Sequence, residues 1–142
     1  MDKREIIQHF QGGIDCAQVV AMPFAGEFGY DESELARICA PFGCGMLRGE
    51  TCGAVTGALV VLGLAYGQSE LGAREEKALM MEKVREFQER FIAERGSTQC
   101  RALCGYDLSV PGEMEKCIMD GVMLDECPDN VLCAQRILQE LL

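Results

Sequence analysis

The stretch TCGAVTGALVVLGLAYG, residues 51–67, decides how the chain folds, because it is a long apolar run without a charged side chain. From Cys52 to Gly67 it covers 16 residues, fewer than the ~20 that a helix needs to span a bilayer. The run therefore predicts a buried core helix, and no other segment is a candidate for membrane insertion. Thr51 is a favoured N-cap residue, so we expect it to cap this helix.

Two glycines within this run share a helix face. Gly53 and Gly57 are four residues apart, which places them one turn above each other in a helix. A glycine in a helix interior costs about 1 kcal/mol relative to alanine. The pair therefore predicts that a neighbouring helix or a cofactor approaches the backbone closely.

The rest of the chain predicts further helices and no strand, since no convincing alternation of apolar and polar residues occurs. Pro23 predicts a kink, and the Asp31–Glu34 pair predicts a capping box. The other expected helices span residues 3–10, 14–28, 31–40, 73–95, 98–104 and 128–142, some of them short, and residues 115–123 are a further helical piece. We expect an all-α fold, a compact bundle of five to seven helices in a single domain over residues 1–142.

Residues 73–95 carry the clearest amphipathic pattern. Met80, Val84, Phe87 and Phe91 recur at helical spacing and form one apolar stripe. The stripe predicts a helix packed on the core, and the alternative is the face of a homodimer or of another partner.

The composition excludes several classes of protein. The net charge is −10, which disfavours nucleic acid and anionic membrane surfaces as partners. Hydrophobic residues make up 49% of the chain, which argues against disorder. The nine cysteines are an odd number and no signal peptide is recognisable, so we expect a protein of the reducing cytoplasm.

Four cysteines stand where helices are expected to begin. Cys16 follows Asp15, Cys52 follows Thr51, Cys100 follows a Gly-Ser-Thr-Gln segment, and Cys127 precedes a proline. The free N–H groups of a helix N-terminus are expected to lower the pKa of a thiol there. Thiolates bind metals and attack disulfides, so the four cysteines predict either an iron–sulfur cluster or a set of exchanging dithiols.

The segment 42–50 contains three glycines and predicts a loop that can approach another group closely. Its N–H groups are suited to donate to cluster sulfurs. We expect Gly43 and Gly45 of this loop, with Gly53, to contact a cofactor.

The chain resembles the C_GCAxxG_C_C family of small redox-active proteins over nearly its whole length. The matching segments are Asp15-Cys16-Ala17-Gln18, residues 42–46, residues 49–58, Leu62-Gly63, residues 100–103, and Cys127 with Val131. The characteristic cysteines of the family fall on Cys16, Cys52, Cys100 and Cys127. The resemblance implies an all-α fold and a redox role, and a similar module in split-Soret cytochromes accompanies an iron–sulfur-type centre.

The chain departs from the family in its additional cysteines. They are Cys39, Cys44, Cys104, Cys117 and Cys133. Cys44 stands in the loop where the family usually has glycine, so it is the strongest substitute for one of the four ligands.

Three hypotheses follow for the function. The first is a [2Fe–2S] or [4Fe–4S] protein for electron transfer or redox sensing, with Cys16, Cys52, Cys100 and Cys127 as ligands and an unidentified redox partner protein. The second is a metal-free thiol–disulfide protein, in which Cys52 or Cys100 belongs to the reacting pair. The third is a structural zinc site or a helical interaction module. The sequence does not decide whether the protein is an enzyme.

Overall fold

The computed structural model describes residues 1–142 and contains eight α-helices. They are α1 (Lys3–Gln11), α2 (Cys16–Ala21), α3 (Glu32–Cys39), α4 (Gly53–Tyr66), α5 (Arg74–Arg95), α6 (Cys100–Cys104), α7 (Glu113–Met119) and α8 (Glu126–Leu141). The only β pairing is an isolated bridge between Thr51 and Gln99. The all-α prediction is confirmed, and the eight helices exceed the expected five to seven, because the helical piece expected over residues 115–123 forms a separate helix, α7.

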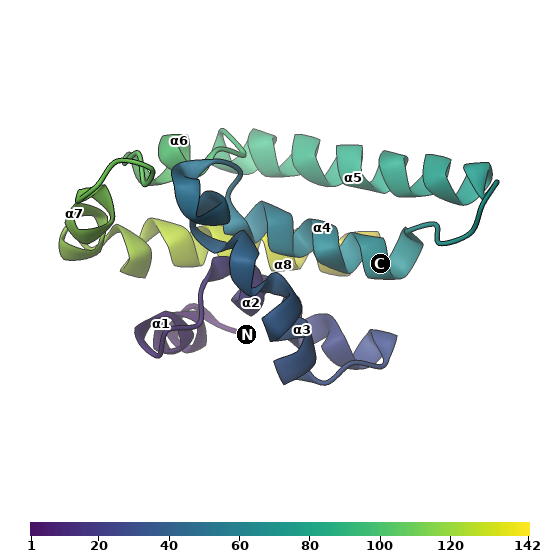
Figure 1. Ribbon diagram of the computed structural model, residues 1–142, viewed down its shortest axis with the longest axis horizontal. Helices are drawn as coiled ribbons and strands as arrows, with labels where there is room; N and C mark the ends of the chain where they lie inside the picture. Colours follow the sequence, from purple (N-terminus) through teal and green to yellow (C-terminus); the bar gives the residue numbers. More distant parts are fainter.

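The apolar run forms α4, which lies at the centre of the fold as predicted. Its buried residues are Gly53, Ala54, Val55, Gly57, Ala58, Val61 and Leu62. Helices α2, α5 and α8 pack around it. Figure 1 shows α4, α5 and α8 running along the long axis, with α1, α2 and α3 beneath them and α6 and α7 gathered at one end. None of the helices combines the length and apolar character that crossing a membrane requires.

Helices α2 and α4 approach each other at the glycine positions of α4. A Cβ atom on Gly57 would lie 2.4 Å from the carbonyl oxygen of Ala17. A contact that short is incompatible with any side chain, so glycine is required for the two backbones to meet. The close approach predicted from the glycine spacing is therefore confirmed, and at Gly57 the neighbour is a helix.

The kink expected at Pro23 and the capping box expected at Asp31 are both present, but the helix before Pro23 is shorter than expected. The expected helix over residues 14–28 ends early at Ala21 and continues as a 3₁₀ helix from Met22 to Phe28, in which Pro23 removes a backbone donor. The capping box of α3 is present, with the Asp31 carboxylate accepting from the Glu34 amide at 2.8 Å.

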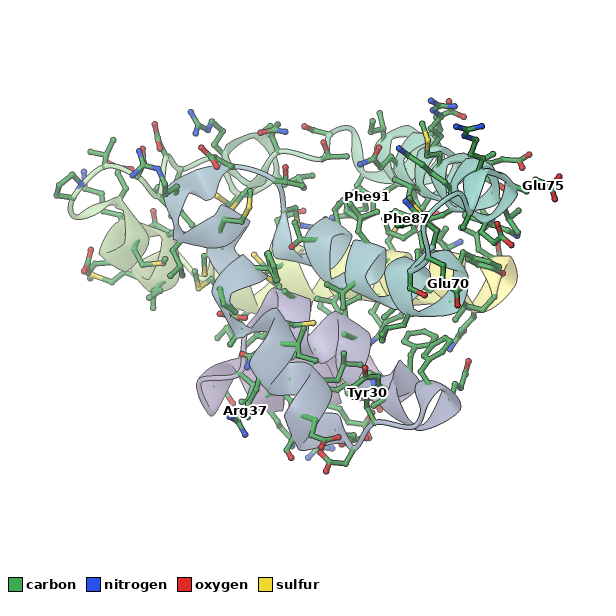
Figure 2. The ribbon with its side chains drawn as sticks, turned by 45° about the vertical axis from the view of Figure 1, so that its right-hand side comes forward. Tyr30, Arg37, Glu70, Glu75, Phe87 and Phe91 are labelled. Atoms are coloured by element: carbon green, nitrogen blue, oxygen red, sulfur yellow. The ribbon has the colours of Figure 1, made fainter.

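The stripe of α5 is buried only in its C-terminal half. Phe87 and Phe91 are fully buried and their ring centroids lie 6.0 Å apart, whereas Met80 and Val84 are half-buried. Figure 2 shows Phe87 and Phe91 directed toward the other helices and Glu75 directed away from them. The prediction that this helix packs on the core is therefore confirmed for its second half.

The apolar interior consists of two separate clusters. The larger contains 23 buried residues from most of the bundle. The smaller contains Cys104, Leu108 and Cys117, at the end of the molecule where α6 and α7 lie. Cys104, Leu108 and Cys117 therefore lie outside the main core, in a cluster against which Cys44 and Cys100 also pack.

Candidate functional site

The four cysteines singled out by the sequence all stand at helix starts. Cys16 is the first residue of α2, Cys100 is the first of α6, and Cys127 is the second of α8. Cys52 is the N-cap residue of α4, the position expected for Thr51. That expectation is wrong because Thr51 is instead extended and pairs with Gln99 in the isolated bridge.

This bridge brings two of the helix starts together. The amide of Cys52 donates to the carbonyl of Thr98 at 2.7 Å, and the amide of Cys100 donates to the carbonyl of Glu50 at 2.6 Å. Each hydrogen bond joins the backbone of one cysteine to the segment that precedes the other. Two thiols far apart in the sequence are thus fixed side by side by main-chain bonds.

The helix starts surround a cavity of about 150 Å³. Seven of the nine cysteines line it, namely Cys16, Cys44, Cys52, Cys100, Cys104, Cys117 and Cys127. The remaining wall is mainly apolar, with Phe10, Ile14, Leu103 and Leu108 among its residues. Figure 2 shows yellow sulfur atoms gathered at the end of the bundle that holds α6 and α7. All nine cysteines are free thiols, and the two outside the cavity, Cys39 and Cys133, are buried in the main core.

The three glycines expected at a cofactor hold the thiol-bearing segments close together. A Cβ atom on Gly53 would lie 2.2 Å from the Cys16 sulfur, so only glycine lets this thiol sit on the first turn of α4. A Cβ atom on Gly43 would strike the Asp15 carboxylate, and one on Gly45 would lie 2.9 Å from Cβ of Cys100. Gly53 lines the cavity itself, whereas Gly43 and Gly45 lie behind it.

The glycine-rich loop contains a left-handed turn, for which the sequence holds no signal beyond its glycines. Four consecutive residues have positive φ, namely Cys44 (52°), Gly45 (64°), Met46 (57°) and Leu47 (61°). For a residue other than glycine this conformation costs roughly 1–2 kcal/mol. Strain of this kind persists where the surrounding structure imposes it, and it concentrates at functional sites.

Two hydrogen bonds hold this turn in place. The amide of Glu50 donates to the Gly45 carbonyl at 3.0 Å, and Nε of Arg101 donates to the Gly49 carbonyl at 3.0 Å. Arg101 belongs to α6, so the turn is attached to the helix that carries Cys100. The turn in this way positions the Cys44 thiol on the cavity wall.

Burial dominates the electrostatics of the cavity. The pKa of Cys52 is raised to about 12, chiefly by burial and next by the neighbouring Cys16, while the amides of Ala54 and Val55 act in the opposite direction. The pKa values of Cys16, Cys100 and Cys127 are likewise raised, first of all by burial. The expectation that helix starts lower the pKa of these thiols is therefore wrong, because desolvation outweighs the N–H groups.

Asp15 is a cavity residue that the sequence marked only as a helix cap. Its Oδ1 atom is buried and has no hydrogen-bond partner, and burial raises the pKa of the carboxyl group. Its charge also raises the pKa of the Cys16, Cys39 and Cys44 thiols. No feature of the sequence distinguishes such a buried carboxylate from an ordinary cap.

The thiols surround a space and do not converge on one point. No three His, Cys, Asp or Glu side chains are placed to hold a single metal ion. The sequence-predicted cysteines are therefore brought into one cavity without forming a closed mononuclear site. Cys104 and Cys117, which the sequence left without a role, lie in the same cavity.

Comparison with known proteins gives one match. The family model described as "Putative redox-active protein (C_GCAxxG_C_C)" matches residues 14–141. No curated protein and no solved structure matches the chain.

Proposed function

Because the chain belongs to the C_GCAxxG_C_C family of redox-active proteins, we propose that it binds an iron–sulfur cluster through Cys16, Cys52, Cys100 and Cys127. One observation carries the proposal: four cysteines from four different helix starts line a single cavity. The cluster would serve electron transfer or redox sensing in the reducing cytoplasm.

The raised pKa values support a bound metal over free thiols. A thiol whose pKa is about 12, as for Cys52, carries almost no thiolate at neutral pH and is a weak nucleophile. A metal cation reverses this, because a coordinating thiol loses its proton outright. The cavity disfavours the deprotonated form of a thiol that has no metal bound, yet seven thiols line it. It is therefore suited to bind a cationic group such as iron.

The arrangement of the thiols supports a cluster over zinc. A structural zinc ion needs four ligands at about 2.3 Å from one point. A cluster instead spreads its ligands around several metal atoms, and the thiols here lie around a cavity with no three placed on one ion. The volume, about 150 Å³, matches an engineered cavity that holds benzene, so there is room for a compact inorganic core.

The surrounding amides fit the charge of a thiolate-bound cluster. An oxidised [2Fe–2S] centre with four thiolates is a dianion, and N–H groups directed at the sulfurs stabilise it and tune its potential. The amides of Ala54 and Val55 act to lower the pKa of the Cys52 thiol, and the amide of Cys44 acts to lower that of Cys16, so these amides favour the thiolate forms. A [4Fe–4S] centre would use the same donors, so both cluster types remain within the proposal.

The residues around the cluster would give it a mainly apolar surrounding. Phe10, Ile14, Leu103 and Leu108 form an apolar wall, which favours one-electron transfer over reaction with solvent. The partner is accordingly a one-electron carrier protein that docks near the cavity.

The test is a series of serine substitutions in protein loaded with iron without oxygen. Cys16→Ser, Cys52→Ser, Cys100→Ser and Cys127→Ser are expected to lower the iron bound per chain or to shift the visible spectrum. Cys39→Ser and Cys133→Ser are the controls, because these thiols are also removed from the surface but lie outside the cavity. Cys44→Ser tests whether Cys44 replaces one of the four ligands, and this variant is expected to retain iron. Equal iron content together with unchanged spectra in all seven variants would contradict the proposal.

A further inference from the structure

Helix α7 presents large apolar side chains to solvent. Its one buried residue is Cys117, which lines the cavity. The next two residues, Ile118 and Met119, have exposed fractions of 55% and 86%. Packing within the chain therefore does not account for these two side chains, and exposed apolar residues rimmed by polar ones are typical of interaction sites.

Two carboxylates flank this apolar pair. Glu115 lies three residues before Ile118 and four before Met119, so the three side chains share one face of the helix. Asp120, the C-cap residue of α7, follows Met119 directly. Neither carboxylate forms an ion pair, and Asp120 accepts a hydrogen bond from the Tyr106 hydroxyl. The four residues Glu115, Ile118, Met119 and Asp120 are called the α7 surface below.

The chain around the α7 surface is acidic as well. Residues 104–126 contain six acidic side chains and one basic side chain, Lys116, which pairs with Glu113 at 3.3 Å. Three of the other acidic residues pair with cations from elsewhere in the chain, namely Asp107 with Arg101, Asp125 with Lys3 and Glu126 with Arg95. The α7 surface therefore retains two carboxylates without a cation partner, in a chain whose net charge is −10.

These charges select the kind of partner that fits. A second copy of this chain, or an anionic membrane surface, would place like charges against each other, which is unfavourable. A protein with lysine and arginine side chains around an apolar centre complements both the carboxylates and the apolar pair. The net negative charge of the chain also attracts such a protein before contact is made.

We propose that the α7 surface docks a basic partner protein, with Ile118 and Met119 at the centre of the contact and Glu115 and Asp120 at its rim. A small contact is sufficient, since transient encounters between redox proteins bury less than about 1,200 Å². Because Cys117 of the same helix lines the cavity, a single helix separates the docked protein from the cavity. The inference rests on the proposed function only in making the partner an electron carrier.

The test measures by calorimetry how tightly the full-length protein, loaded with iron without oxygen, binds a basic c-type cytochrome. The expected result is binding at low ionic strength that weakens as salt is added, because the rim charges are exposed to solvent. An acidic plant-type ferredoxin is the opposite probe. It is expected to bind at least about tenfold more weakly, since its charge has the same sign as that of the α7 surface.

Matched variants locate the contact, and all the side chains that they change are exposed, so the variants are expected to fold. Glu115→Gln and Asp120→Asn are each expected to weaken cytochrome binding about two- to fivefold, as for exposed ion pairs. Glu75→Gln changes the net charge equally at the start of α5, at the opposite end of the molecule from α7 (Figures 1 and 2), and is expected to leave the affinity nearly unchanged. Met119→Ser is expected to weaken binding at least about fivefold, whereas Leu79→Ser, its control on α5, is not.

Several results would overturn the inference. They are the absence of cytochrome binding, equal weakening by Glu115→Gln and Glu75→Gln, and tighter binding of the ferredoxin than of the cytochrome. A homodimer that Met119→Ser dissociates would overturn it too, because the occupant of the α7 surface would then be a second copy of the chain.

Iron and sulfide measured on the same samples keep the two proposals apart. Cytochrome binding that depends on the α7 surface, in protein that takes up no iron, would support the docking surface and contradict the cluster. Iron-loaded protein whose cytochrome binding does not depend on the α7 surface would support the cluster and contradict the docking surface.

Discussion

At the scale of single residues, a glycine determines where a cysteine sulfur can lie. Gly53 leaves the space that the Cys16 sulfur occupies, since a Cβ atom there would lie 2.2 Å from it. The glycine is thus needed both for packing and for the position of a proposed ligand.

Gly53→Ala is expected to lower the free energy of unfolding by about 1–3 kcal/mol, as for other overpacked sites, and to reduce iron binding. Gly63→Ala is the matched control in the same helix, because a Cβ atom at Gly63 meets nothing within 4 Å. It is expected to stabilise the fold by about 0.5–1 kcal/mol. Urea unfolding and iron analysis measure both effects, and equal behaviour of the two variants would refute this account of Gly53.

The buried thiols predict how stability depends on pH in the metal-free, reduced protein. The pKa of Cys52 is raised from 9.0 to about 12 in the fold, so between these values the unfolded thiol loses its proton while the folded one keeps it. Unfolding then releases a proton, and stability falls as the pH rises above 9. The slope is about 1.4 kcal/mol per pH unit for each such thiol.

Urea unfolding from pH 8 to pH 11 measures this slope. Cys52→Ala is expected to reduce the slope of stability against pH by about the contribution of one thiol. Iron-loaded protein is expected to lack the contribution of every thiol that binds iron. A slope that is unchanged in Cys52→Ala would contradict the burial of this group.

At the scale of elements, the left-handed turn and the isolated bridge position the helix starts around the cavity. Leu47 lies in the turn with φ of 61° and an exposed fraction of 60%, so it has backbone strain and little packing. Leu47→Gly is expected to stabilise the fold by about 0.5–1 kcal/mol, since glycine removes roughly 1–2 kcal/mol of strain at some cost in chain entropy.

Leu79→Gly is the control for this substitution. Leu79 is an exposed leucine with an exposed fraction of 43%, and it lies in α5. There glycine is expected to destabilise the fold by about 1 kcal/mol. Thermal or urea unfolding of the two variants should give opposite signs, and destabilisation by Leu47→Gly of the same size would argue against a strained turn.

At the scale of the whole molecule, the apolar interior consists of a main core and a smaller cluster of Cys104, Leu108 and Cys117.

The sequence predicted the local features of this fold better than its long-range ones. Cap residues and Pro128 located the helix starts at Cys16, Cys100 and Cys127, because capping is a local interaction. The convergence of these starts depends on the Thr51–Gln99 bridge, which joins residues distant in the chain and has no local pattern. The direction of the thiol pKa shifts was predicted wrongly for the same reason, since burial is a property of the assembled fold.

The proposed cluster is tested by the iron and acid-labile sulfide content of wild-type protein purified without oxygen, together with its visible spectrum. The account predicts about two to four irons per chain, a matching amount of sulfide, and thiolate-to-iron absorption that Cys16→Ser or Cys127→Ser alters. Colourless protein that contains no iron after iron-replete expression, or that contains zinc alone, would contradict it.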